Sequence, residues 1–217
     1  FKTRLSLSSS SVDEVIQKRV LGKTEVATKQ LEDNYSKNQS VLRNLFTFQN
    51  AMADLKGYKD SKAFANNYPF VPYQFTVLQK VFAEIRRHGN SGIHLSGGER
   101  SMLSGFQEAA QKIQDKDENT LAPFYLFYDT VHTFLDSTIR RVVERADKMA
   151  ENGEGLEKQD VDLLKLLYLV KYIDTEIKST IDNLVILSAD SITMDKISKK
   201  ESITSSFDRL IKANFVA

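Results

Sequence analysis

Apolar residues recur at helical spacing along most of the chain, and short polar or glycine-containing breaks separate the runs. Ser11 and Glu14 form a capping box, in which each side chain satisfies a backbone N–H at the start of a helix. Apolar positions then follow every three or four residues, and the pattern continues weakly across Gly22 to Tyr35. A further apolar cluster at residues 41–48 predicts another short helix.

Prolines, glycines and capping residues divide the middle of the chain. Pro72 suits the first position of a helix whose apolar face runs from Phe75 to Ile85. Basic residues and Gly89 mark the end of that helix. Ser96, Gly97, Gly98 and Glu99 form a second capping box before an apolar stripe at residues 102–113, and residues 121–145 predict one longer helical stretch.

The segment Glu-Asn-Gly-Glu-Gly at residues 151–155 is the best linker candidate, so we expect a domain boundary there. Three short helices are predicted after it, one from Asp160, one after Thr180 and one that carries Ile203 to Ile211. The last ends close to an apolar pair, Phe215 and Val216, that could begin a strand. This order is typical of a winged-helix unit whose wing would lie beyond Ala217.

Composition narrows the classes of function. Apolar residues make up 41% and charged residues 27% of the chain, as in ordinary globular proteins. The absence of cysteine excludes disulfides and thiolate metal sites, and His88 and His94 fit a helix end and a loop better than a metal pair. A net charge of +1 predicts no general attraction to nucleic acid, and no apolar run approaches the ~20 residues that span a membrane. We therefore expect a cytoplasmic protein without a metal site.

Residues 95–100, Leu-Ser-Gly-Gly-Glu-Arg, resemble the signature motif of ABC-transporter ATPases. No Walker A loop accompanies them, and the nearest match to a Walker B strand, residues 124–129, follows Pro123 and precedes Thr130 where a catalytic carboxylate is expected. The capping box accounts for the serine, the glycines and the glutamate. At about 100° per residue, Arg100 lies about 120° from the centre of the apolar stripe, at the margin of the buried face.

The segment from Gly97 to Leu103 is similar to the sensor-2 element of AAA+ ATPase lids, in which an arginine near the start of a lid helix reaches the γ-phosphate. A planar guanidinium suits a terminal phosphate. Arg100 is therefore the candidate for nucleotide sensing. Arg86 and Arg87 are weaker candidates for contacts with another domain or subunit.

A longer ordered set of motifs resembles the BREX-system P-loop ATPases of bacterial phage defence, of the BrxC/PglY type. The matching segments are residues 68–75 (Tyr-Pro-Phe-Val-Pro-Tyr-Gln-Phe), 78–82, 85–86, 94–96, 98–103, 106–109, 123–129, 162–167 and 182–184. The likeness runs from about Val12 to the end. It implies a larger ATPase that uses ATP and Mg²⁺, with its P-loop core upstream of Phe1 and with other BREX proteins, among them a DNA methyltransferase, as partners.

The resulting expectation is a mainly α fragment. Residues 1–11 are expected to be a disordered or terminal segment, residues 12–152 a helical AAA+ lid-like domain, and residues 156–217 a truncated winged-helix-like unit. The fragment itself, with no cofactor of its own, would link the nucleotide state of the upstream core to partner or DNA engagement. A homo-oligomer is possible; an enzyme active site within these residues is the least supported idea.

Two other functions stay open. In the first, residues 68–102 dock another BREX protein and nucleotide plays no part. In the second, the C-terminal helices bind DNA, with Lys199, Lys200, Arg209 and Lys212 as phosphate contacts. Acidic residues are interleaved with these cations, which is also typical of a solvated face. His132, between Asp129 and Asp136 at i−3 and i+4, is expected to form surface ion pairs.

Overall fold

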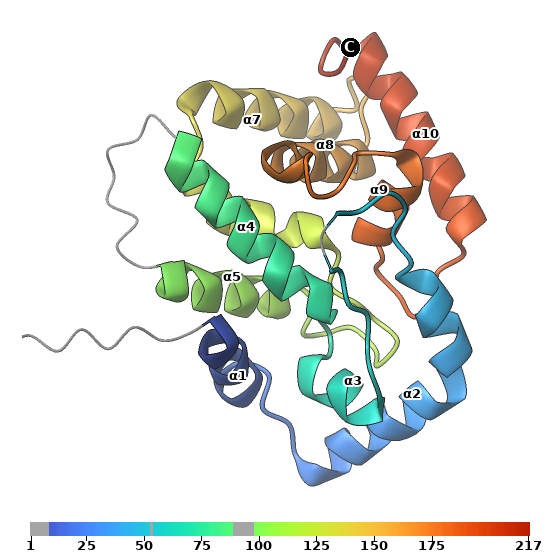
Figure 1. The fold of residues 1–217 in the computed structure, drawn as a ribbon. Helices are drawn as coiled ribbons and strands as arrows, with labels where there is room; N and C mark the ends of the chain where they lie inside the picture. Colours follow the sequence, from blue (N-terminus) through green and yellow to red (C-terminus); the bar gives the residue numbers. More distant parts are fainter. Residues whose placement is uncertain (1–8, 53, 89–97) are drawn as a thin grey trace, which may run out of the picture.

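Helices joined by irregular segments make up the computed structural model, which describes residues 9–52, 54–88 and 98–217 (Figure 1). No strand forms within these ranges, and a single antiparallel bridge joins Thr120 to Ser191. The prediction of a mainly α fold is confirmed. The helices are α1 (Ser9–Arg19), α2 (Glu25–Leu45), α3 (Ser61–Asn67), α4 (Pro72–His88), α5 (Gly98–Lys112), α6 (Tyr128–Val131), α7 (Ser137–Glu151), α8 (Lys158–Val170), α9 (Ile181–Leu187) and α10 (Lys196–Lys212), with 3-10 turns η1 (Phe124–Phe127), η2 (His132–Phe134) and η3 (Lys171–Ile173).

Helix α4 crosses the middle of the molecule, with α1 to α3 towards one end and α7 to α10 towards the other (Figure 1). Helix α2 packs on α3, α1 on α5, and α7 on α8, while α10 contacts both α8 and α9. One buried apolar cluster runs from Val12 to Leu210 through all of these contacts. Residues on both sides of the predicted boundary at 152–156 belong to this cluster.

The N-terminal helices are divided differently from the prediction. The weak pattern across Gly22 is interrupted between Arg19 and Glu25, because Thr24 begins a new helix by accepting a hydrogen bond from the Ala27 N–H at 3.2 Å. Helix α2 then continues to Leu45. The separate short helix predicted at residues 41–48 is therefore wrong, because most of that cluster is the end of α2.

The start of α4 agrees with the prediction from Pro72, and a buried amide fastens it to a distant segment. Gln74 is 1% exposed. Its Oε1 accepts a hydrogen bond from the Val71 N–H at 2.9 Å, and its Nε2 donates to the Ala122 carbonyl at 2.7 Å. Both ends of the amide are thus satisfied, which makes the polar side chain tolerable in the core.

The single long helix predicted over residues 121–145 is wrong. The chain forms η1, α6 and η2 in turn before α7 begins, and Leu135 is extended between η2 and α7. Asp136 starts α7 by accepting a hydrogen bond from the Thr138 N–H at 2.7 Å. Buried apolar side chains at Leu121, Phe124 and Phe127 produce a helix-like pattern in the sequence although they come from irregular and 3-10 structure.

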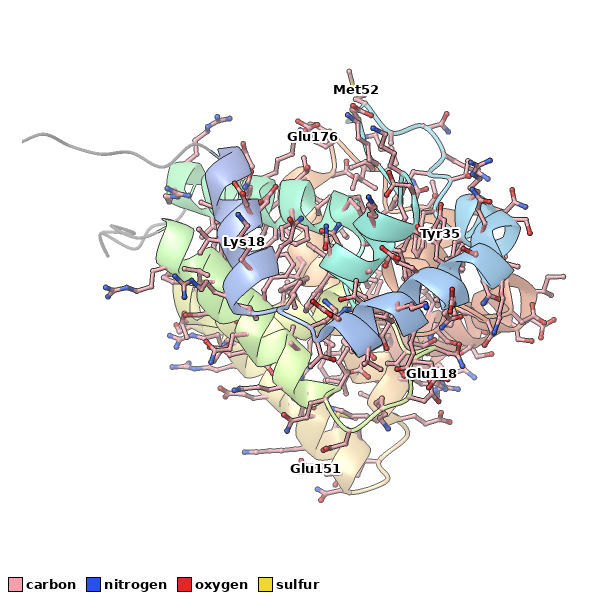
Figure 2. All side chains as sticks on the ribbon, turned by 90° about the horizontal axis from the view of Figure 1, so that it is seen from below. Lys18, Tyr35, Met52, Glu118, Glu151 and Glu176 are labelled. Carbon is pink, nitrogen blue, oxygen red and sulfur yellow. The ribbon has the colours of Figure 1, made fainter. Side chains whose placement is uncertain are left out.

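Residues 46–52 and 54–60 form an irregular strap that follows α2, and backbone hydrogen bonds attach it to the C-terminal part. Asn183 is fully buried; its Oδ1 accepts from the Gln49 N–H and its Nδ2 donates to the Gln49 carbonyl, both at 2.9 Å. The Met52 N–H donates to the Glu176 carbonyl at 3.0 Å. Met52 and Glu176 lie at the same edge of the molecule, and the Met52 side chain, with the residue 86% exposed, projects outward (Figure 2).

The C-terminal region forms the three helices expected there, α8 to α10. Gly153 and Gly155, at φ of +69° and +82°, turn the chain between α7 and α8, a conformation that glycine adopts without strain. Phe215 and Val216 do not begin a strand. Phe215 instead lies under the guanidinium of Arg145, 4.5 Å from its ring centroid, which holds the end of the chain against α7.

Candidate functional site

The arginines that the sequence singles out lie at two consecutive helix ends. Arg86 and Arg87 are exposed in the last turn of α4, and Arg100 is exposed in the first turn of α5. Within the ranges that the structure describes, the Arg100 guanidinium makes no hydrogen bond or ion pair. Residues 89–97 join the two helices, so the predictions for Gly89, His94 and Ser96 lie outside the described residues.

The two arginines of α4 are engaged within their own helix. Arg86 Nε donates to the Phe82 carbonyl at 3.2 Å, and Arg87 Nη1 lies 3.0 Å from a carboxylate oxygen of Glu84. The Arg87 side chain is 69% exposed, so this ion pair is weak and a competing anion can replace it. Of the three arginines, Arg100 therefore makes the fewest hydrogen bonds and ion pairs with the described residues.

Helix α5 holds Arg100 on a fixed support. Met102, Phe106 and Ala109 are buried on one face of the helix, with exposures of 3%, 0% and 0%. The Phe106 ring stacks on Phe75 of α4, with centroids 4.2 Å apart. The buried face thus anchors the helix whose first turn carries Arg100, an arrangement that keeps a binding residue in place.

Three of the four cations proposed as DNA contacts are paired within the protein. Lys199 Nζ lies 2.7 Å from Asp190, and Lys200 Nζ lies 2.7 Å from Asp182. Lys212 is exposed, and no ion pair holds it in the described part of the chain. Contact of Lys199 or Lys200 with a phosphate would have to replace an existing ion pair.

Arg209 is held most firmly of the four. Its Nε and Nη2 donate to the two carboxylate oxygens of Asp160 at 2.7 Å each, and Asp160 is fully buried. Burial alone would raise the pKa of Asp160, but the hydrogen bonds from Arg209, Ser206 and the Glu157 N–H hold it below its ordinary value. The guanidinium therefore joins α10 to the start of α8, a role that the sequence did not indicate.

A network of charges connects α5, α6, α7 and α8. Lys165 Nζ lies 3.9 Å from Asp129 and 3.6 Å from Asp147; Lys112 also pairs with Asp129, and Lys158 lies 3.3 Å from Asp147. The Lys165 side chain is 13% exposed, so water screens this network less than a surface pair. The sequence could not reveal it, because its members are far apart along the chain.

The expected ion pairing of His132 is not what the structure contains. The Asp129 carboxylate faces Lys112 and Lys165, and the Nδ1 of His132 contacts the backbone carbonyl of Asp129. Asp136 caps α7 instead. Helical spacing was misleading because η2 and the extended residue Leu135 interrupt the helix between His132 and Asp136.

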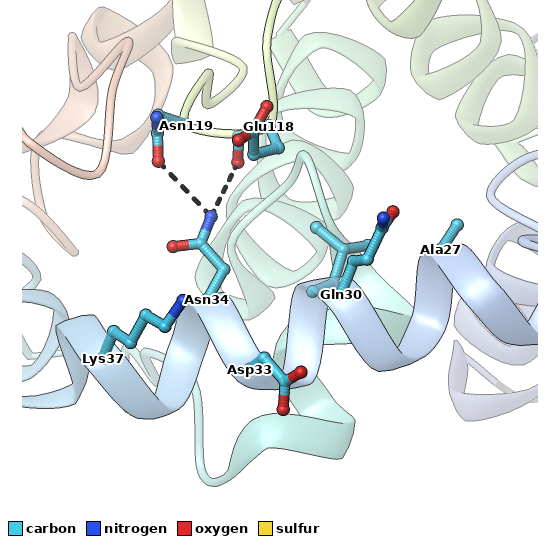
Figure 3. Close-up of a pocket in the computed structure, with 8 residues that line it drawn as sticks. Ala27, Gln30, Asp33, Asn34, Lys37, Glu118 and Asn119 are labelled. Atoms are coloured by element: carbon cyan, nitrogen blue, oxygen red, sulfur yellow. Dashed lines mark hydrogen bonds between the residues drawn. The ribbon is translucent and has the colours of Figure 1, made fainter.

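A polar pocket of about 500 Å³ lies between α2 and the segment that follows α5 (Figure 3). Asn34 links the two sides of the pocket, because its Nδ2 donates to the Glu118 carbonyl at 3.1 Å and to Asn119 Oδ1 at 3.3 Å. Asp33 and Lys37 also line it. These two hydrogen bonds hold α2 against residues 118–119. No cluster of three or more metal-ligating side chains occurs among the described residues.

None of the described helices is both long and apolar enough to cross a membrane. The chain matches no protein-family model. No solved structure matches it either.

Proposed function

We propose that this chain is a non-catalytic regulatory region of a BREX-type ATPase and that Arg100 senses the nucleotide held by a P-loop core elsewhere in the same protein. The observation that carries the proposal is the exposed guanidinium of Arg100, without an intramolecular partner among the described residues, on a helix start that buried side chains anchor. The ordered resemblance from residue 68 to residue 184 supplies the parent activity.

In this proposal α1 to α7 act as an AAA+ lid-like unit, and α8 to α10 act as a winged-helix-like unit without its wing. ATP and Mg²⁺ belong to the parent protein, which works in the cytoplasm as a possible homo-oligomer with other BREX proteins. Arg100 would contact the terminal phosphate, and Arg86 and Arg87 would contact the core or a neighbouring subunit. A guanidinium aimed at a terminal phosphate favours charge-assisted, bidentate hydrogen bonds.

The test is the Arg100→Ala substitution in the full-length protein. We expect ATP turnover and phage restriction both to fall by about tenfold or more, since loss of a charge-assisted phosphate contact weakens the interaction by about that factor. The matched control is Arg19→Ala, which removes an exposed arginine from the end of α1. Unchanged turnover and unchanged restriction in the Arg100 variant would refute the sensor role.

A second candidate function is a docking module for another BREX protein. The exposed side chain of Arg87 favours it, because its ion pair with Glu84 is weak and such a residue suits the rim of an interface. A pull-down with the 217-residue chain separates the two functions. Capture of a BREX partner without nucleotide supports docking, whereas ATP-dependent capture of a separately expressed core supports sensing.

Direct DNA binding through α8 to α10 is the third candidate. Lys212 supports it as an exposed cation, while the ion pairs of Lys199 and Lys200 and the buried partner of Arg209 reduce the number of available contacts. A mobility shift that weakens steeply with salt is expected if these helices bind DNA. No shift at low salt would remove this candidate.

A further inference from the structure

A second pocket, of about 780 Å³, lies where α1, α2, the strap, α3 and the start of α4 meet. Its volume falls within the range of small-molecule sites in proteins, about 300–1,000 Å³. Residues of α5 do not line it, so it is separate from Arg100. The nature of its walls indicates what it could bind.

One wall is apolar and firmly held. Phe46 and Phe75 line it and are 6% and 2% exposed, so most of each ring is packed in the core. Tyr58 stands edge-on to Phe46 with ring centroids 5.9 Å apart, and its hydroxyl donates to the Phe70 carbonyl at 3.0 Å. This wall offers a rigid, partly aromatic surface against which a flat ring can pack.

The rim is basic. Arg43, Lys56 and Lys59 are exposed at the pocket, and Asp13 is the carboxylate among its lining residues. Lys56 pairs with Asp54 at 3.0 Å, but both side chains are more than 70% exposed, so this pair is weak. Arg43 and Lys59 have no ion pair within the described ranges. Burial raises the pKa of Asp13 to about 6, so this carboxyl loses its negative charge only below that pH.

The remaining wall carries amide groups. Gln17 Nε2 donates to Asn67 Oδ1 at 2.9 Å, and Asn67 Nδ2 donates to the Ala63 carbonyl at 2.7 Å. Asn67 is 6% exposed and therefore fixed in orientation. The carbonyl oxygen of Gln17 accepts no hydrogen bond from the described residues, so it is available to an N–H donor on a ligand.

We propose that this pocket binds a small organic anion with a flat nitrogen heterocycle, of the kind that a nucleoside monophosphate presents. The anionic group would lie among Arg43, Lys56 and Lys59, where several cations converge. The ring would pack against the apolar wall and donate an N–H to Gln17. Because α1 provides Asp13 and Gln17, the bound ligand also holds α1 in place.

The experiment titrates the 217-residue chain with AMP, GMP, CMP and UMP by calorimetry, with the corresponding nucleosides and inorganic phosphate as the separate halves of each ligand. We expect at least one monophosphate to bind about tenfold more tightly than either half, because ring and anion contacts combine. Arg43→Ala and Lys59→Ala should each weaken that binding by about tenfold. Lys62→Ala is the matched control, an exposed lysine of α3 that does not line the pocket.

Two further measurements make the outcome decisive. Gly57→Ala should weaken binding, because residue 57 lines the pocket, and leave the circular dichroism unchanged, because a Cβ there meets only Phe46, at an ordinary 3.5 Å. Ligand should also slow hydrogen exchange of the α1 amides. No binding by any of the four nucleotides, or binding that none of the pocket variants weakens, overturns the proposal. The Arg100 experiment is unaffected by either result.

Discussion

The two halves of the molecule specify their packing by different means. Around α3, α4 and α5 the core is aromatic, and ring pairs such as Phe75 with Phe106 and Phe70 with Phe106 have defined stacked or edge-on geometries, at centroid distances of 4.2 and 4.7 Å. Around α8 to α10 the buried side chains are mainly aliphatic. There the directional contacts are ionic, with the Asp160–Arg209 pair at their centre.

The difference has a physical basis. Aliphatic side chains fill space well but can be repacked at small cost, so an aliphatic core alone specifies helix positions weakly. Aromatic rings are flat and carry a quadrupole, which restricts how neighbours approach. We infer that ring geometry positions the helices near α4, whereas the partly buried Asp160–Arg209 ion pair positions α8 and α10.

The largest effect is expected from the centre of the aromatic region. Phe106→Ala should lower the free energy of unfolding by about 4 kcal/mol, because it removes a fully buried ring that contacts Phe70, Phe75 and Phe127. A second comparison uses conservative changes in both regions. Leu166→Met, at a fully buried position of α8, should lower the free energy of unfolding by less than about 1.5 kcal/mol. Phe106→Leu should cost more than Leu166→Met in urea denaturation; equal losses would contradict the role of ring geometry.

The ionic region has its own decisive residue. Asp160→Ala should lower the free energy of unfolding by about 3 kcal/mol, since it leaves Arg209 without its buried partner and the Glu157 N–H without an acceptor. Asp162→Ala is the control on the same helix. Among the described residues it makes one ion pair, with Lys158 at 3.9 Å, so we expect little change. A small effect at Asp160 would show that apolar contacts alone position α10.

The two regions should respond to pH in opposite directions. Burial raises the pKa of Asp13 from 3.8 to about 6, so the folded state binds more protons and this group contributes stability that is lost as pH rises from about 4 to 6. The pKa of Asp160 is held below its ordinary value, so its contribution is present above about pH 4 and is lost on acidification. The free energy of unfolding can be measured by urea denaturation from pH 3 to 7. Asp13→Asn should remove the loss of stability between about pH 4 and 6, and Asp160→Asn should remove the loss of stability on acidification. Identical pH profiles for wild type and both variants would contradict these assignments.

The smallest effect is expected at exposed ion pairs. Lys200 and Asp182 lie 2.7 Å apart with side chains 52% and 42% exposed, so Lys200→Ala should change the free energy of unfolding by less than about 0.5 kcal/mol. Lys18→Ala, which breaks an exposed pair with Glu14 in α1, should behave alike. Thermal unfolding can compare the two variants. A loss above 1 kcal/mol in the Lys200 variant would indicate that surface charge also positions α10 against α9.

Local signals in the sequence predicted much of the helical framework. Pro72 at the start of α4 and Thr180 before α9 act within one turn of the chain, so their effect can be read from neighbouring residues. The division of residues 121–145 into several short elements escaped prediction, because buried side chains such as Phe124 and Phe127 in η1 recur at a spacing that periodicity alone cannot distinguish from an α-helix.

The candidate site was predictable only in part. Arg100 could be singled out from the sequence, because the capping box explains the residues before it but gives the arginine no structural role. The partner of Arg209 could not be anticipated, since 49 residues separate it from Asp160. The pocket at Arg43 and Lys59 was also missed, because its walls come from five segments and no local motif links them.

The strap is attached to the C-terminal part through main-chain groups at Gln49 and Met52, and its buried side chains Phe46 and Tyr58 hold it against the aromatic core. Its path therefore depends little on which amino acids it contains at exposed positions. Residue 52 is a natural place for a spectroscopic label, because a fluorophore there would project into solvent while the backbone stays bonded to residue 176. Such a label lies on the segment that carries Lys56 and Lys59, and so reports on the neighbouring pocket without occupying it.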